Sequence, residues 1–267
     1  MSDQSLHQLE SLQCSVDGAI ATITINRPEN HNAINYEMWS VIPDYCQWLE
    51  QNQDIRVIIW KGAGENAFSA GGDISEYREN RNNKENSLHY NDCVATALKA
   101  IQQLSKPNIA CIKGYCVGGG LILSSHCDLR IAAENARFGI PIAKLGTIVT
   151  YEQMQRFMQI MGAAAIHDLL LTARLMDAQE AYTRGLCGQL YPLDEIDEAV
   201  MQLATSMTRL SPVSQALHKR MLETLLETPD LAQLTEAQRR LVDDSFDTAD
   251  YAEGIRAFIE KRSPNFG

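Results

Sequence analysis

The sequence predicts an α/β fold in its first part, followed by a region made only of helices. Short apolar runs, such as residues 56–60, alternate with amphipathic segments up to about residue 190. This alternation is typical of mainly parallel sheets whose strands are joined by helices. After Tyr191 every further segment has helical spacing. We therefore expect an α/β core over residues 1–193 and a helical region over residues 194–267.

The individual elements follow from local patterns. Strands are expected at residues 19–25, 56–60, 109–113 and 129–132, because these runs are apolar and rich in β-branched side chains. Helices are expected at residues 36–51 and 88–104, and Pro43 inside the first of them predicts a kink or a later start. Four more helices are expected at residues 195–209, 212–228, 231–244 and 249–261. The charged, asparagine-rich residues 76–87 are interpreted as a mobile loop.

Composition excludes several classes of protein. The net charge of −11 argues against nucleic-acid binding, because phosphates need a basic surface. Residues 1–12 are polar, and no apolar run reaches the length of a membrane span, so we expect a cytoplasmic protein without a signal peptide. The seven cysteines include no CxxC pair and the six histidines are dispersed. We expect reduced thiols and no metal site.

Two glycine-bearing segments carry most of the functional information. Residues 67–74 read Ala-Phe-Ser-Ala-Gly-Gly-Asp-Ile, and residues 113–120 read Lys-Gly-Tyr-Cys-Val-Gly-Gly-Gly. Each has the pattern of a strand end, a glycine turn and a helix start, where backbone N–H groups stay free to bind negative charge. Two such groups converging on one oxygen would form an oxyanion hole. The alternative is that both segments are tight turns.

These two segments, together with residues 127–132 (Cys-Asp-Leu-Arg-Ile-Ala), resemble the crotonase (enoyl-CoA hydratase/isomerase) superfamily. The resemblance extends from residue 23 to residue 266. It implies a spiral of ββα units with a C-terminal helical trimerisation region, and a homotrimer or hexamer. It also implies that the N–H groups of Gly72 and Gly119 hold the thioester oxygen of an acyl-CoA. No separate cofactor is implied, because the substrate carries the coenzyme A.

The resemblance further implies which residues contact the coenzyme. Arg27 would lie at the phosphates, and the Ala70 carbonyl and Ile74 would lie along the adenine and pantetheine channel. Phe258 and Lys261, in the helical tail, would close the coenzyme site, which can belong to a neighbouring subunit.

Two isoleucines depart from the hydratase pattern. Hydratases of this superfamily carry one glutamate just after the triple glycine and a second after a Phe-Gly-x-Pro turn. Here the matching residues are Ile122 and Ile142. An alkyl side chain neither accepts nor donates a proton, so the usual hydration mechanism is not available. We interpret both residues as the lining of an apolar pocket, which strengthens electrostatic contacts inside it.

Other side chains are candidates for proton transfer. Tyr151 and Glu152 follow the Leu-Gly pair at residues 145–146, where relatives with other chemistries place reactive groups. Alternatively, they open the next helix. His126 lies one helical turn after Ile122 and can approach the pocket, or it can be a hydrogen-bonded core residue. Asp128 is expected to satisfy backbone donors.

Three functions remain open from the sequence. Decarboxylation of a malonyl-type acyl-CoA suits the site best, because loss of CO₂ creates the enolate without a base. The second is an enoyl-CoA hydratase or isomerase that uses substitute groups such as Tyr151 or Glu152. The third is a protein that binds CoA esters without catalysis. The acyl-CoA thioester is the expected partner in all three.

Overall fold

A computed structural model describes residue 6 and residues 8–266, so the polar residues 1–12 and the outer bounds of both predicted regions lie partly outside the described residues. The core is built on two sheets. The larger has the strand order β1 (Leu12–Asp17), β2 (Ile20–Ile25), β3 (Val57–Gly62), β5 (Asn108–Ile112), β7 (Leu129–Ala133) and β10 (Gln189–Tyr191). The smaller has the order β4 (Ala67–Ser69), β6 (Tyr115–Val117), β8 (Arg137–Gly139) and β9 (Met176–Asp177). Only the pairs β1–β2 and β8–β9 are antiparallel within the described residues.

Helices connect and cover the strands. They are α1 (Tyr36–Gln51), α2 (Tyr77–Asn80), α3 (Lys84–Gln103), α4 (Gly119–Ser125), α5 (Tyr151–Thr172), α6 (Ala178–Thr183), α7 (Ile196–Met207), α8 (Pro212–Glu227), α9 (Glu236–Ser245) and α10 (Ala249–Glu260). Short 3₁₀ turns occur at Pro28–Asn30, Ile74–Glu76, Pro141–Leu145 and Leu231–Gln233. None of the helices in the described residues is both long and apolar enough to cross a membrane.

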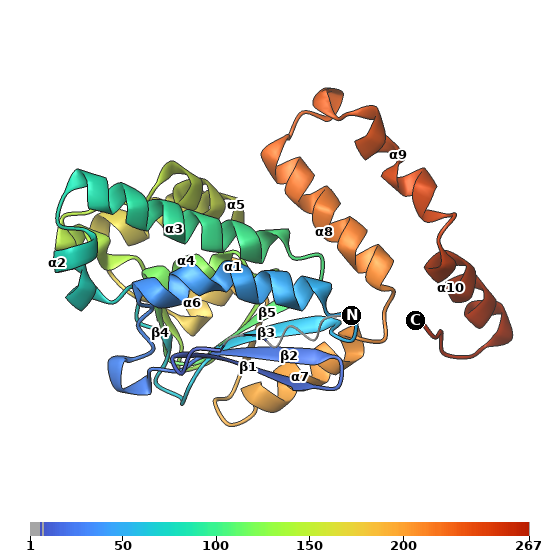
Figure 1. The fold of residues 1–267 in the computed structure, drawn as a ribbon, viewed down its shortest axis with the longest axis horizontal. Helices are drawn as coiled ribbons and strands as arrows, with labels where there is room; N and C mark the ends of the chain where they lie inside the picture. Colours follow the sequence, from blue (N-terminus) through green and yellow to red (C-terminus); the bar gives the residue numbers. More distant parts are fainter. Residues whose placement is uncertain (1–5, 7, 267) are drawn as a thin grey trace.

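The large sheet is covered on both faces (Figure 1). Successive strand residues point to opposite sides, so Ile58 and Trp60 of β3 join the main core under α1 and α3. Val57 and Ile59 of the same strand pack on the other side against α7. This explains why residues 57–60 of the strand are all apolar, as is usual for a parallel strand between two helical layers.

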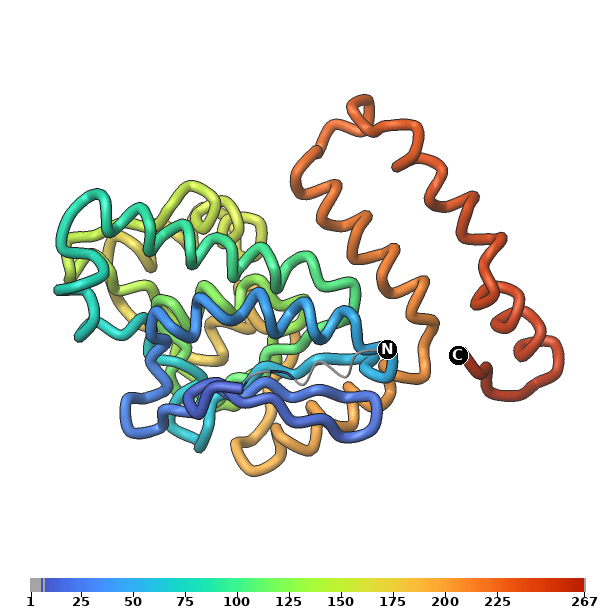
Figure 2. Tube along the Cα trace, in the orientation of Figure 1, coloured from blue at the N-terminus to red at the C-terminus, as the bar shows by residue number. Residues whose placement is uncertain are grey.

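Helices α8–α10, residues 212–260, form an arm that stands away from the core (Figures 1 and 2). Among the described residues, none in α8 or α9 is buried. Large apolar side chains of this C-terminal arm are exposed: Leu222, Leu225, Val242, Phe246, Phe258 and Ile259. The end of the chain nevertheless returns to the core. The Arg56 guanidinium donates to the carbonyls of Leu210 (2.8 Å) and Phe266 (3.2 Å).

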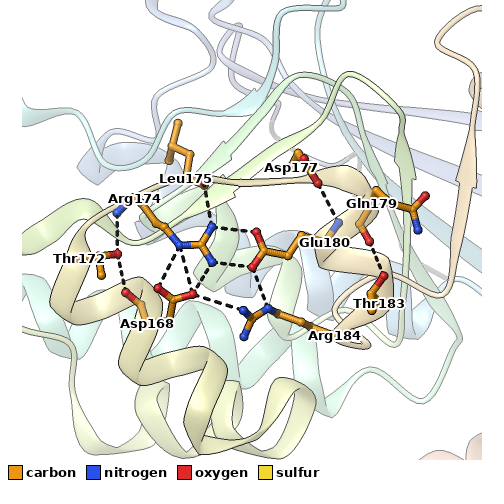
Figure 3. Close-up of polar contacts among 9 residues, drawn as sticks. All are labelled: Asp168, Thr172, Arg174, Leu175, Asp177, Gln179, Glu180, Thr183 and Arg184. Carbon is orange, nitrogen blue, oxygen red and sulfur yellow. Dashed lines mark hydrogen bonds and ion pairs between the residues drawn. The ribbon is translucent and has the colours of Figure 1, made fainter.

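An ionic cluster holds α5, β9 and α6 together (Figure 3). Arg174, in the turn after α5, donates from Nε to Asp168 (3.0 Å) and from Nη1 to Glu180 (2.8 Å). Arg184 also contacts Glu180, at 2.8 Å. The cations lower the pKa values of both carboxyl groups, and the hydrogen bonds from Arg174 are the main cause. The cluster therefore fixes the turn that leads into β9, the edge strand beside β8.

Most predicted elements are confirmed, and two predictions are wrong. The helix at Tyr36–Gln51 has the predicted bounds and continues through Pro43. Residues 76–87 are not a loop, because a 3₁₀ turn, α2 and the first turn of α3 occupy them. The side chain of Asn83 caps α3 by accepting from Asn86 N at 2.9 Å. Residues 231–244 are not one helix, because α9 starts only after the capping residue Thr235.

The cysteines match the expectation of free, buried thiols. Cys14, Cys46, Cys111, Cys116, Cys127 and Cys187 are buried, and Cys93 is half-buried. Burial raises their pKa values, for example to about 12 for Cys46 and Cys127.

Candidate active site

The first glycine segment follows β4 and is fixed by backbone bonds from the loop before α1. Ile34 N donates to Gly71 O at 2.8 Å, and Asp73 N donates to Ile34 O at 2.9 Å. These two bonds flank Gly72 and leave its own N–H unused. Gly71 has φ = +120°, a conformation that favours glycine. The buried side chain of Asn32 supports the segment by donating to Ala67 O at 2.7 Å.

The second glycine segment connects β6 to α4. Gly118 has φ = +51° and donates to Gly139 O at 2.9 Å, which joins the segment to β8. Gly119 is the first residue of α4. Its N–H therefore belongs to the first turn, where helical N–H groups have no partner within the helix.

The two segments lie side by side. A Cβ atom built on Gly119 would lie 3.1 Å from Gly72 N and 3.3 Å from Gly71 C. No acceptor in the described part of the chain takes a hydrogen bond from Gly72 N or Gly119 N. The structure thus brings together the two N–H groups that the sequence singled out, and both are free to meet a ligand oxygen.

Two pockets meet at this glycine pair. The outer pocket, of about 540 Å³, is lined by His31, Ala70, Gly71, Gly72, Ile74, Tyr77, Tyr115, Val117, Gly118, Gly119, Pro141, Ile142, Lys144, Leu145 and Leu175. The inner pocket, of about 80 Å³, is lined by Trp39, Gly72, Tyr77, Arg81, Tyr90, Asn91, Val94, Gly118, Gly119, Ile122, Ile142, Leu145, Thr147, Ile148, Val149, Thr150 and Gln153. A ligand oxygen at the glycine pair would thus have one part of the ligand on each side.

The inner pocket has an apolar floor and few groups able to move a proton. Ile122 and Ile142 both line it, as the sequence predicts. Among the described residues that line it, none carries a carboxylate, an imidazole, an amine or a thiol. The hydroxyl groups that line it are the phenols of Tyr77 and Tyr90 and the side chains of Thr147 and Thr150.

The two phenols reach the glycine pair itself. A Cβ atom on Gly72 would lie 2.7 Å from the Tyr77 hydroxyl oxygen and 3.3 Å from that of Tyr90. The Arg81 guanidinium stacks on both rings, 4.9 Å from the Tyr77 centroid and 5.0 Å from the Tyr90 centroid. Burial, followed by the neighbouring Tyr77, raises the pKa of Tyr90, and Arg81 opposes this rise. Tyr77 and Arg81 were missed because they lie within the residues expected to form a loop, and Tyr90 because it lies in the helix expected after that loop.

Tyr151 and Glu152 do not line either pocket. They are the first two residues of α5, and the Tyr151 side chain is 89% exposed. Hydrogen bonds from the Glu152 backbone N–H and from the Thr150 hydroxyl lower the pKa of Glu152. Their neighbours Thr150 and Gln153, which form a capping box, line the inner pocket instead. The alternative interpretation, that the pair opens a helix, is confirmed.

His126 and Asp128 have structural surroundings. His126 Nδ1 lies 2.9 Å from Ile122 O, and burial lowers the pKa of its imidazole to about 4. It is a core residue and lines neither pocket. Asp128 accepts from Asn108 N at 2.7 Å, which confirms its predicted role, and it also pairs with Lys219 of α8 at 2.7 Å.

Only two of the five residues expected at the coenzyme line the outer pocket. Ala70 and Ile74 line the outer pocket, and Ile74 is 55% exposed there. Arg27 lines neither pocket and pairs with Asp73 at 2.8 Å. Burial acts to raise the pKa of Asp73, but hydrogen bonds from Ser75 and Arg27 together lower it. Phe258 and Lys261 lie at the end of α10, outside both pockets, and Phe258 is 84% exposed.

The chain is similar to known proteins over nearly its whole length. A family model described as enoyl-CoA hydratase/isomerase matches residues 15–267. A probable enoyl-CoA hydratase of Mycobacterium bovis is 33% identical over 261 residues, covering 96% of this chain and 98% of that protein. The 2,3-dehydroadipyl-CoA hydratase of Escherichia coli is 32% identical over 247 residues, covering 92% of this chain and 94% of that protein.

Solved structures show the same likeness. The crystal structure of an enoyl-CoA hydratase/carnithine racemase from Magnetospirillum magneticum is 35% identical, with a TM-score of 0.93, and covers 97% of this chain and 96% of its own. The structure of Pseudomonas aeruginosa DspI is 28% identical with a TM-score of 0.91 and covers 100% of both chains.

Proposed function

The chain belongs to the enoyl-CoA hydratase/isomerase family, and we propose that Gly72 N and Gly119 N bind the thioester oxygen of its acyl-CoA substrate. The family match and the solved structures confirm the predicted resemblance to the crotonase superfamily and its α/β fold. The proposed oxygen site is supported by the contact between the two glycine segments and by their two free N–H groups. Donors held ready for a developing oxyanion are often the largest single contribution to catalysis of acyl chemistry.

We further propose that the reaction is the decarboxylation of a malonyl-type thioester. One observation carries this proposal: the inner pocket has no carboxylate or imidazole among its described lining residues. In decarboxylation the bond between Cα and the carboxylate carbon breaks, and its electron pair forms the enolate while CO₂ leaves. The enolate oxygen would stay between Gly72 N and Gly119 N. No base is needed, and the only proton required is the one that the α-carbon receives.

Tyr77 is the proposed proton donor. Its hydroxyl is the one nearest the glycine pair, whereas Tyr151 is exposed at the start of α5. The phenol would transfer its proton to Cα, and the resulting phenolate would regain a proton from solvent. The apolar side chains of Ile122 and Ile142 would keep competing water away from the enolate.

The outer pocket is the proposed site of the coenzyme. It lies on the other side of the glycine pair, and Ala70 and Ile74 line it. Lys144 in its wall would meet a phosphate. We propose no separate cofactor, because the substrate carries the coenzyme A. The exposed apolar surface of the C-terminal arm supports a further proposal, that the chain assembles as a trimer or hexamer.

The test is CO₂ release from methylmalonyl-CoA and ethylmalonyl-CoA by the purified protein. We expect turnover, and we expect Tyr77→Phe to lower kcat by about 10²- to 10⁴-fold, because a positioned proton donor contributes about that much. Tyr182→Phe is the matched control, since Tyr182 is half-exposed on α6 and lines neither pocket. Absence of CO₂ release from both substrates would refute the decarboxylase proposal.

A second candidate is hydration or isomerisation of an enoyl-CoA, favoured by the names of the curated relatives. It predicts that the absorbance of the conjugated thioester is lost when crotonyl-CoA is added, and that Tyr77→Phe or Tyr90→Phe slows this loss. Tight binding of CoA esters in calorimetry, without turnover of any of these substrates, would identify the third candidate, a non-catalytic binding protein.

A further inference from the structure

Arg81 is a cation in the wall of the inner pocket. It follows α2 and is half-buried. Its guanidinium rests on the rings of Tyr77 and Tyr90, and Nη2 donates to the Asn91 side-chain oxygen at 3.3 Å. No carboxylate among the residues the structure describes forms an ion pair with it.

Acidic residues outnumber basic ones by 34 to 23, and the other partly buried arginines have several acceptors. Arg27 and Arg156 are paired with carboxylates, and Arg56 and Arg130 donate to two or more backbone carbonyls. Among the described residues, the Arg81 guanidinium has only the Asn91 side-chain oxygen. A charge withdrawn from water is costly unless it finds a partner. The two rings orient the planar guanidinium but neutralise none of its charge. Its remaining N–H groups form a fork suited to a planar anion.

The position of Arg81 identifies which part of the substrate it faces. Arg81 lines the inner pocket and does not line the outer one. Both pockets share Gly72 and Gly119, where the thioester oxygen is proposed to bind. With the coenzyme in the outer pocket, its phosphates lie on the other side of the glycine pair. The group that reaches Arg81 is then the acyl group.

We propose that the acyl group of the substrate carries a carboxylate and that Arg81 binds it, with Asn91 holding the guanidinium in place. This inference rests on the proposed acyl-CoA binding described above. It makes Arg81 a specificity-determining residue for anionic acyl groups. The same chemistry can come from a carboxylate on the α-carbon, as in malonyl thioesters, or from one at the far end of a short dicarboxylic chain.

The test compares CoA thioesters of equal chain length in calorimetry with the full-length protein. Succinyl-CoA against butyryl-CoA probes a carboxylate at the far end, and malonyl-CoA against propionyl-CoA probes one on the α-carbon. For malonyl-CoA, KM of CO₂ release replaces the dissociation constant if turnover occurs. We expect the carboxylated member of at least one pair to bind about 10- to 100-fold more tightly, the range of a charge-assisted hydrogen bond.

Variants assign that difference to Arg81. Arg81→Gln is expected to abolish the preference within the pair that shows it, and an unchanged circular dichroism spectrum shows that the variant is folded. Arg78→Gln is the matched control, because Arg78 lies on α2, the short helix that Arg81 follows, and is exposed outside the inner pocket. Equal binding within both pairs, or a preference that survives Arg81→Gln, would overturn the inference while acyl-CoA binding stands. Failure of every ester to bind would refute the proposed function as well.

Discussion

At the scale of single residues, adjacent glycines in the second segment serve different purposes. A Cβ atom on Gly119 would point toward Gly72 N, 3.1 Å away, and so into the space where a ligand oxygen would sit. A Cβ atom on Gly120 would lie 2.5 Å from Ser69 O, too close for α4 to pack against β4. The first glycine keeps the proposed oxygen site open, and the second allows the two segments to approach.

Replacing Gly119 by alanine should therefore damage activity more than folding. Position 119 begins α4, and a Cβ atom there, 3.1 Å from Gly72 N, requires the neighbouring backbone to shift by only a few tenths of an ångström. We expect Gly119→Ala to lower kcat/KM for CO₂ release by about 10²- to 10³-fold, because the methyl group would occupy the oxygen site. Loss of one oxyanion donor has an effect of that size. The melting temperature should stay close to that of the unmodified protein.

Gly188→Ala controls for the loss of a glycine, because a Cβ atom at position 188 would meet its nearest contact only at 4.0 Å. Full activity of Gly119→Ala would contradict the proposed place of the thioester oxygen. We expect Gly120→Ala, by contrast, to lower the melting temperature.

The glycines could be predicted from the sequence, but the phenols beside them could not. A glycine between a strand and a helix indicates a tight turn, and that turn is formed by its neighbours in the sequence. The hydroxyl groups of Tyr77 and Tyr90 lie near Gly72 because α2 and α3 bring the two rings over the first glycine segment. No spacing in the sequence encodes that approach. Tyr151 and Glu152 show the converse. They lie between pocket residues in the sequence, but they do not line the inner pocket.

At the scale of elements, capping decides which boundaries can be predicted. The helix at Tyr36–Gln51 follows Asn35, whose side chain accepts from Met38 N at 2.9 Å, and its apolar residues keep helical spacing. Helix α3 starts four residues before the predicted position 88, because its first turn is polar and only Asn83 marks the start. Asparagine-rich sequence favours loops and caps alike, so composition could not separate the two.

The ionic cluster at Arg174 is the element-scale feature that can be tested most directly. Replacing Arg174 by glutamine would remove its hydrogen bonds to Asp168 and Glu180 and leave Arg184 as the remaining cation that contacts both carboxylates. We expect amide hydrogen exchange in α6 and at the end of α5 to become about two- to fivefold faster, because partly exposed ion pairs contribute modestly.

The effect should stay local, because the cluster joins α5, β9 and α6 and no part of the C-terminal arm. Arg240→Gln removes an exposed pair with Glu236 on α9 and should leave exchange in α5 and α6 unchanged. Unchanged exchange in the Arg174 variant would mean that the turn is held by backbone and packing alone.

At the scale of the whole molecule, the C-terminal arm exposes large apolar side chains. Its contacts to the core run along α8, from Lys219 with Asp128 to Leu226 with Gln159. We expect light scattering to give a mass of three or six times the 29.8 kDa of one chain. Leu222→Glu together with Ile259→Glu should shift that mass toward one chain.

His218→Gln on α8 is a control that keeps the apolar surface intact. A mass of 29.8 kDa for the unmodified protein at micromolar concentration would contradict the proposed assembly. In that case Phe258 and Lys261 would have no neighbouring coenzyme site to close.

The buried thiols have a consequence for how the protein meets oxidants. Alkylating agents and peroxides react with thiolates, and thiol pKa values near 12, as at Cys111 and Cys187, leave almost no thiolate at neutral pH. Cys116, within the second glycine segment, is fully buried, so damage there would require the core to open first. The seven cysteines of this chain therefore contribute to packing, and their thiols react slowly with oxidants.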